Sequence, residues 1–366
     1  MNGSLDGALD ALNVSTQRHI RRTPILIDGI FQSDAGMAML KKSCIQPFPG
    51  GRVIAGNFTF DTLLGGFYNQ GNDFDISQQK TDDQLQWFPK FAQGNVTTTL
   101  EMLEVLNTGS DAVYKDVNSQ LRNCYNSLGT WLAISQYLPN ATTGYSKLLV
   151  GYAEAISDGS NNSWNGATYT TYGGLTRSSY NGALTSYVPT TLGGAQIEYD
   201  DLTDAISECS WGENEMEPNI LLTTPKGSTS IKKRFQVQQR ITESTPVIGF
   251  KGFSVENSTV LKSRYCPGQD IVTAGKKSKR VADRFLNHTT GGVVATYPSV
   301  SGETMFIMNM RKPNIHLHVS TSSRYQFGFT GWKLAANNTK LSGQVLWSGA
   351  LTLDNPSFFG QLINFA

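Results

Sequence analysis

The stretch SDAVYKDVNSQLRNCYNSLGTWLAISQY, residues 110–137, predicts the element around which the rest of the chain is arranged. Its apolar residues recur at the spacing of an amphipathic helix. These residues are Val113, Val117, Leu121, Leu128 and Leu132. Pro139 follows and ends the helix. At ~1.5 Å per residue the helix is a rod of roughly 40 Å, long enough to be the backbone of a flattened subunit.

Two strand-like segments precede this helix. Residues 52–66 and 85–99 alternate apolar and polar side chains around a middle rich in glycine, aspartate and glutamine. They predict one long hairpin, which has too few apolar side chains to close a core of its own. Trp87, Phe88 and Phe91 lie on it, and a two-stranded element cannot bury three aromatic rings alone. We therefore expect these three residues to be intersubunit contacts.

Beyond the helix, the stretch YGGLTRSSYNG at residues 172–182 has two interpretations. In the first, it is an anion-holding active-site loop of a soluble enzyme. In the second, it is a structured turn in which Arg177 forks to carboxylates or carbonyls as a structural or subunit-contact residue. The sequence has no G-x-S-x-G, Walker or G-x-G-x-x-G motif. We therefore expect no enzyme and predict no catalytic or cofactor-binding residue.

The remaining segments mix helical and strand patterns. Residues 199–211 have helical spacing, and residues 219–227 predict an apolar strand that stops at Pro225. Strand patterns resume at Met305 and continue to the end of the chain. Residues 1–49 show no sustained period and predict an extended or partly helical arm. Together these patterns predict an α+β fold.

The charge balance argues against a nucleic-acid-binding or membrane-bound protein. Thirty basic residues against 29 acidic ones give a formal net charge of +1, so the whole chain has no field that attracts nucleic acid or anionic lipid. The basic run GKKSKRVADR at 275–284 contains no aromatic residue for base stacking and predicts a surface loop. No window approaches the ~20 apolar residues of a membrane span, and no secretion signal is present. We expect a soluble protein made in a reducing cytoplasm.

Metal-binding signals are sparse. His316 and His318 lie two residues apart and share one face of a predicted strand. A single pair, without further ligands at suitable spacing, favours a structural strand face over a metal site. The four cysteines are far apart in the sequence and predict buried, reduced thiols. They are Cys44, Cys124, Cys209 and Cys266.

The order of these features resembles that of tailed-phage major capsid proteins of the Hong Kong 97 fold. The resemblance covers nearly the whole chain from about residue 50. The stretches that carry it are, in order, GNVTTTLEMLEVLNTGSDAV before the long helix, TYGGLTRSSYN, PNILLTTPKG with FQVQQRIT, FKGFSVENSTVLKSRYCP, MFIMNMRKPNIHLHV and GQVLWSGALTLDNPSFFGQL.

The resemblance implies five regions. Residues 1–49 would be the N-terminal arm, and residues 50–96 the extended loop, or E-loop, which in that family lies across a neighbouring subunit. Residues 97–140 would belong to the peripheral domain with its spine helix. Residues 141–304 would form the axial domain, which surrounds the centre of a capsomer, and residues 305–366 would return to the peripheral domain.

The chain departs from the family pattern at one place. The family passes almost directly from the SRYCPxG turn to the strand that corresponds to MFIMNM, whereas here an insert at about 269–304 intervenes. We also find no long charged N-terminal extension that would act as a built-in scaffold. This implies a separate scaffolding protein, or a chain that has already been trimmed.

The implied function is that of a major capsid protein. Such a chain assembles as hexamers and pentamers into an icosahedral head that encloses double-stranded DNA without sequence-specific binding. Scaffolding protein and portal would be its partners, it would need no cofactor, and it would reach the virion after assembly in the host cytoplasm. Two alternatives stay open: an encapsulin-type compartment of the same fold, and a soluble enzyme that uses residues 172–182.

Overall fold

The fold is described from a computed structural model. The described residues are 10, 12–14, 16–17, 34–61, 63, 65–70, 77–101, 110–140, 146–180, 182–189, 192–210, 217–235, 243–247, 250–268, 302–334 and 339–366. The helices are α3 (Ala35–Ser43), α4 (Ser110–Ser135), α5 (Tyr152–Ala155), α6 (Tyr199–Glu208) and α7 (Pro225–Phe235), with the 3-10 turns η2 (Arg177–Ser179) and η3 (Pro356–Phe358). The strands are β1 (Ile45–Phe48), β2 (Ile54–Thr59), β3 (Asp82–Trp87), β4 (Lys90–Thr99), β5 (Thr171–Tyr172), β6 (Leu175–Thr176), β7 (Ile220–Thr223), β8 (Glu243–Val247), β9 (Phe250–Val255), β10 (Ser258–Lys262), β11 (Glu303–Met308), β12 (Ile315–Ser320), β13 (Gln326–Phe329), β14 (Lys333–Leu334), β15 (Lys340–Leu353) and β16 (Gly360–Phe365).

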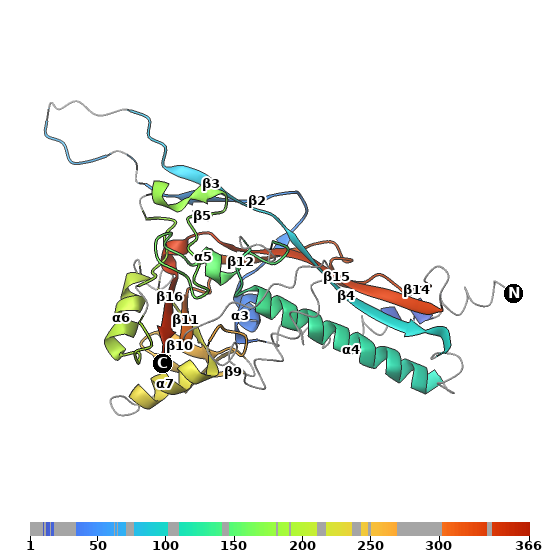
Figure 1. Cartoon of the computed structure of the whole chain (residues 1–366). Helices are drawn as coiled ribbons and strands as arrows, with labels where there is room; N and C mark the ends of the chain where they lie inside the picture. Colours follow the sequence, from blue (N-terminus) through green and yellow to red (C-terminus); the bar gives the residue numbers. More distant parts are fainter. Residues whose placement is uncertain are drawn as a thin grey trace.

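The first sheet is organised around the 14-residue strand β15. One end of β15 pairs with β12, which in turn pairs with β1, and the other end pairs with β4 and β14. The helix α4 runs beside β4, and the three elements extend together away from the rest of the molecule (Figure 1). A Cβ atom on Gly94 of β4 would lie 2.5 Å from Cys124 Sγ of α4, so a glycine at this position lets helix and strand approach closely.

The predicted long helix is confirmed. It spans Ser110–Ser135, and its apolar stripe faces the sheet. Val117, Leu121 and Leu128 are buried, and Leu132 continues the stripe into the main core. The side chain of Val113 lies outside the described part of the helix.

The second sheet has the strand order β16-β11-β7-β10-β9-β8. Its central strands β7 and β11 are buried along their whole length, because both of their faces are covered. One face contributes Leu222 and Phe306 to the main core. The opposite face contributes Leu221 and Ile307 to a second apolar cluster, which the helices α6 and α7 cover.

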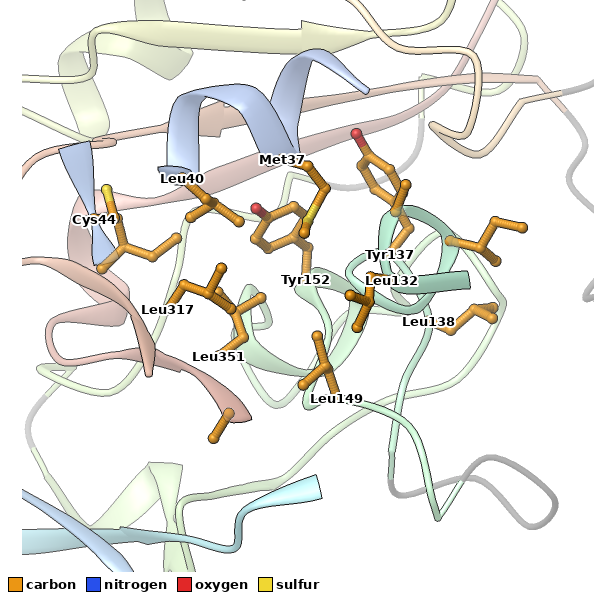
Figure 2. Packing of buried hydrophobic residues seen from close by; sticks show 14 of the residues in the cluster. Met37, Leu40, Cys44, Leu132, Tyr137, Leu138, Leu149, Tyr152, Leu317 and Leu351 are labelled. Carbon is orange, nitrogen blue, oxygen red and sulfur yellow. The ribbon is translucent and has the colours of Figure 1, made fainter. Parts of the chain in front are cut away.

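The main core lies where α3, the end of α4, α5 and the first sheet meet. Figure 2 shows Met37 and Leu40 of α3 packed beside Tyr152, with Leu317 and Leu351 of the first sheet on the other side. The residues Ala35 to Leu40 of α3 are all buried. The sequence predicted an extended or partly helical arm over residues 1–49 but not the bounds of this helix, because six consecutive buried residues have no amphipathic period to detect.

Asp34 joins three parts of the chain in this core. Its carboxylate caps α3 through Gly36 N at 3.0 Å and accepts hydrogen bonds from Gln136 Nε2 at 2.8 Å and Tyr137 Oη at 3.1 Å. Ser263 Oγ, just after β10, donates to its second oxygen at 2.5 Å. Burial raises the pKa of this carboxyl above 3.8, although all four hydrogen bonds oppose the shift. The arm, the spine helix and the second sheet are therefore connected through one side chain.

The structure corrects the predicted long hairpin. It divides at Pro89: only β2 and β3 pair as a hairpin, whereas β4 pairs with β15 along its whole length. Proline lacks the N–H that a continuous ladder requires.

The predicted apolar strand before Pro225 is present as β7, which ends at Thr223. Pro225 itself begins the helix α7, a position where the missing N–H costs nothing.

Other predictions meet the structure only in part. The four cysteines are buried free thiols, as predicted, and the helix predicted at 199–211 is present as α6. Residues 269–301 of the insert and most of residues 1–33 lie outside the described residues. Among the helices that are described, none combines the length and the apolar character that crossing a membrane requires.

Candidate assembly surface

The hairpin β2–β3 carries most of the exposed large apolar side chains of the described residues. Figure 1 shows it at the top of the molecule, apart from the second sheet and its helices. Val53, Leu63, Phe67, Tyr68 and Phe88 are exposed on residues 53–88, and Phe67 is fully accessible. Val14, Phe91 and Leu334 are the other large apolar side chains that the described residues expose. An exposed apolar set on a thin projecting element marks an interaction surface.

The root of the hairpin packs against residues 171–182 of the same chain. Gln86 N donates to Gly173 O at 2.9 Å, and Leu85 is fully buried. Gly173 has φ +56°, and a Cβ atom there would lie 2.6 Å from Leu85 Cδ2. Both the backbone angle and the close approach therefore require glycine. The glycine pair of the stretch YGGLTRSSYNG therefore lets the hairpin pack closely against residues 171–182, which we call the seat of the hairpin.

Tyr180 holds the hairpin from a second side. Its ring lies edge-on to Phe58 and Phe60, with centroids 5.4 and 5.1 Å away. Its hydroxyl donates to Asp83 Oδ2 at 2.7 Å, and Lys80 Nζ donates to the same oxygen at 2.6 Å. The Lys80 hydrogen bond, followed by that of Tyr180, lowers the pKa of Asp83 to about 2. Aromatic packing and a charged hydrogen-bond pair thus fix the base of the hairpin.

Arg177 lies beneath this seat and organises its backbone. Its Nε donates to Tyr169 O at 3.1 Å, and Nη2 donates to Glu154 O at 2.6 Å and Ala155 O at 3.1 Å. Nη1 donates to Leu184 O. The side chain is 1% exposed, and burial lowers its pKa to about 10, which leaves it charged at neutral pH.

The hydrogen bonds of Arg177 decide between the two interpretations of residues 172–182. Every guanidinium nitrogen already donates to a backbone carbonyl, and the group lies 5.1 Å from the ring centroid of Tyr172. Tyr172 in turn bridges the backbone of Leu353, donating to its carbonyl at 3.2 Å and accepting from its amide at 2.9 Å. This arrangement leaves no guanidinium nitrogen directed at an external anion, so the stretch is a structural seat and not an anion-binding loop.

The four predicted contact residues separate into two groups. Trp87 and Arg177 are buried within the subunit, and the Trp87 ring lies 6.0 Å from that of Tyr172. Their side chains therefore have their partners inside the chain. Phe88 and Phe91 are 60% and 66% exposed, and contact with a neighbouring subunit stays a prediction for both.

Sequence reasoning missed the residues nearest the tip of the hairpin. Leu63, Phe67 and Tyr68 interrupt a stretch that is otherwise rich in glycine and polar residues. Apolar residues within the polar segment that joins β2 and β3 could have predicted an exposed contact surface. The hydrogen bond between Tyr180 and Asp83 joins residues 97 positions apart, so no local sequence pattern predicts it.

The histidine pair takes part in structural contacts. His316 Nε2 lies 3.2 Å from Asp354 Oδ2, and His318 Nε2 lies 3.1 Å from Thr352 Oγ1 on the neighbouring strand β15. Burial, followed by the nearby His316, lowers the pKa of His318 to about 4. Within the described ranges, no three His, Cys, Asp or Glu side chains are grouped as a metal would require.

Comparison with known proteins identifies the fold. No protein-family model matches the sequence, and no curated protein matches it. The capsid of cyanophage A-1(L) superposes with a TM-score of 0.61 at 12% identity, covering 90% of this chain and 92% of the other.

Two further solved structures agree. The SrpI encapsulin of Synechococcus elongatus gives a TM-score of 0.54 at 9% identity, with 89% of this chain and 86% of the other covered. The capsid of a native GTA particle gives 0.53 at 7% identity, with 90% of each chain covered. With an N-terminal helix and strand in the core, a projecting hairpin, a long spine helix and two sheets, the chain has the α+β Hong Kong 97 fold.

Proposed function

We propose that this chain is the major capsid protein of a tailed phage. It assembles as hexamers and pentamers into an icosahedral shell that encloses double-stranded DNA. The observation that carries the proposal is the hairpin β2–β3, which presents Leu63, Phe67 and Tyr68 to solvent from a firmly seated root. A single subunit leaves these side chains uncovered, and a neighbouring copy would bury them.

The two sheets support a domain assignment. The long helix α4 with β4 and β15 would belong to the peripheral domain, and the second sheet with α6 and α7 would belong to the axial domain. This changes the assignment of residues 305–366 as a whole to the peripheral domain, because β11 and β16 pair within the second sheet and only the strands between them lie in the first. The hairpin β2–β3 corresponds to the E-loop, which would lie across the next subunit. This assignment gives each subunit two distinct regions of contact, one at the capsomer centre and one at its periphery.

The charge of the chain suits a shell wall. A formal net charge of +1 gives the wall little electrostatic attraction for packaged DNA. Modest contacts repeated over many subunits, with overlapping hairpins, would make the lattice cooperative. A scaffolding protein and a portal would direct assembly in the host cytoplasm, and the mature chain would reside in the virion. The role is structural, without catalysis.

The test is assembly of the expressed full chain. Size-exclusion chromatography and electron microscopy, with and without a candidate scaffolding protein, are expected to show capsomers or closed shells. A folded chain that stays monomeric under both conditions would contradict the proposal. A matched variant, Phe67→Ser, is expected to remain folded and to assemble less well, because it removes only an exposed ring.

An encapsulin-type compartment is the second candidate. The similarity to the SrpI encapsulin, at a TM-score of 0.54, favours it as much as the similarity to the GTA capsid favours a phage head. The contents of purified shells separate the two. Double-stranded DNA, or shells that depend on a portal, supports the phage head, whereas a folded protein cargo supports the compartment.

A further inference from the structure

Two helices on the second sheet carry charge of opposite sign. Each has four charged side chains, all of a single sign. On α6 these are Asp200, Asp201, Asp204 and Glu208; on α7 they are Lys226, Lys232, Lys233 and Arg234. The chain as a whole is balanced, with 30 basic and 29 acidic residues. The separation of charge on these two helices therefore calls for a local explanation.

Both helices cover the same face of the sheet, and they meet at one end: Arg234 in the last turn of α7 lies 2.8 Å from Glu198, the residue that caps α6. Cys209, which caps α6, lies beside Gly360 at the start of the edge strand β16. On α7, Lys232 Nζ lies 4.9 Å from the ring centroid of Phe253 on β9, one strand from the opposite edge. Figure 1 shows α6 beside β16, and α7 near β9 and below the C-terminus, where Ser230 Oγ donates to Ala366 O at 2.8 Å.

The acidic side chains of α6 face the β16 edge. Tyr187 forms a parallel bridge with Gly360 of β16. Burial raises the pKa of the Tyr187 hydroxyl, and the carboxylates of Glu208 and Asp204 raise it further. Asp204 and Glu208 are four residues apart, hence on one side of α6, and both are exposed.

Ion pairs within the subunit use only part of this charge. Arg234 lies 2.8 Å from Glu198, and Lys226 Nζ lies 3.5 Å from the buried carboxylate of Glu303. Three other charged side chains of the two helices form no ion pair with another described residue: Asp204, Glu208 and Lys233. Beyond the contact between Arg234 and Glu198, an acidic patch at Asp204 and Glu208 and a basic patch at Lys232 and Lys233 thus remain at the surface, at different places on one layer.

We propose that the acidic side of α6, at Asp204 and Glu208, docks against the basic last turn of α7, at Lys232 and Lys233, in the next copy of this chain. The inference rests on the proposed function, and it names the contact by which neighbouring subunits recognise each other around a capsomer axis. Two complementary patches at different places on one surface make a head-to-tail contact, and such contacts close into rings. Two α6 helices face to face would instead bring like charges together.

The test uses charge reversal in the full chain. One variant carries Asp204→Lys with Glu208→Lys, and the other carries Lys232→Glu with Lys233→Glu. Each variant alone is expected to form rings only at a protein concentration roughly tenfold or more above that of the wild type. In the α6 variant both contacting patches are basic, and in the α7 variant both are acidic, so every contact joins like charges. Higher salt is expected to weaken the wild-type ring, since exposed charges are screened.

Mixing the two variants gives the sharpest result. The two kinds of subunit must alternate around a ring, so the mixture is expected to form hexamers, which have an even number of subunits, and no pentamers. A chain with all four substitutions is expected to form both. Native mass spectrometry and electron microscopy count the subunits in each case.

A matched control adds Ser119→Lys and Asn123→Lys, also four residues apart, to the exposed side of α4. It is expected to assemble as the wild type does. Circular dichroism and thermal unfolding establish that every variant is folded; if either charge-reversed pair is unfolded, the single substitutions Glu208→Lys and Lys233→Glu take its place.

Three results would overturn the proposal. The first is assembly of each charge-reversed variant at wild-type concentration. The second is a mixture that forms only two-subunit particles, which would mean that the helices pair reciprocally in a dimer. The third is rescue of the α6 variant by Lys276→Glu with Lys277→Glu, which would assign the basic insert as the partner of α6. A wild type that forms no capsomer at all would contradict the proposed function itself.

Discussion

Arg177→Met tests whether the seat of the hairpin depends on one guanidinium. The substitution keeps a long side chain but leaves the carbonyls of Tyr169, Leu184, Glu154 and Ala155 without their donor. A buried polar group that loses its partner costs about 1–3 kcal/mol. Removal of a buried charge returns part of that cost, so we expect a loss of about 3–5 kcal/mol in the free energy of unfolding.

Arg177→Lys is the informative companion to this variant. It keeps the positive charge, but one ammonium group cannot reproduce the planar fork that reaches carbonyls from three segments of the chain. We expect roughly half the loss of the Met variant. The whole chain is stabilised by only about 5–15 kcal/mol, so both changes are measurable.

Urea unfolding of unassembled subunits, followed by tryptophan fluorescence, gives the free energies. Hydrogen exchange is expected to rise first in the backbone around residues 169–184, where the carbonyls lie. Unfolding free energies of both variants within ~1 kcal/mol of the wild type would refute the reasoning. Loss of phosphate binding without loss of stability would instead favour the anion-binding loop that the structure argues against.

Three further predictions concern the seat, the buried carboxyl and the hairpin tip. Gly173→Ala is expected to cost about 2–4 kcal/mol in unfolding free energy, from its φ of +56° and the close Leu85, whereas Gly174→Ala, which faces open space, is expected to cost about 1 kcal/mol. Asp34→Asn is expected to cost about 1–2 kcal/mol at neutral pH, because an amide accepts fewer of the four hydrogen bonds. The pKa of Asp34 is raised above its unfolded value of 3.8, so the protonated carboxyl favours folding; the stability advantage of the wild type over Asp34→Asn is expected to grow as the pH falls towards 3.8, and an advantage that shrinks instead would contradict it. Phe67→Ser is expected to leave unfolding unchanged and to raise the protein concentration needed for assembly about tenfold, as measured by light scattering; equal assembly would remove this ring from the interface.

Sequence reasoning found the elements that have a local period. The stripe at Val117, Leu121 and Leu128 predicted α4 with nearly correct ends, and the order of motifs predicted the fold. It predicted a partly helical arm over residues 1–49 but did not locate α3, whose first six residues, Ala35 to Leu40, are all buried. It also joined β4 to the hairpin, because the partner of β4 is β15, some 250 residues later in the chain, and only tertiary structure brings the two strands together.

The candidate site shows the same division. Exposure of Phe88 and the shortage of apolar residues in the hairpin could be anticipated from composition. The role of Arg177 could not, since the carbonyls of Glu154 and Ala155 are 23 and 22 residues before it and contain no sequence signal. A buried guanidinium and an anion-binding one have the same local sequence, and they differ only in which groups the fold places around them.

Cryo-electron microscopy of particles from the expressed full chain, with a candidate scaffolding protein supplied, tests the proposed capsid role. We expect closed icosahedral shells of hexamers and pentamers, in which the hairpin of each subunit lies across a neighbour that covers Phe67 and Tyr68. A folded chain that forms no shell, or shells in which the hairpin tip stays at solvent, would contradict it.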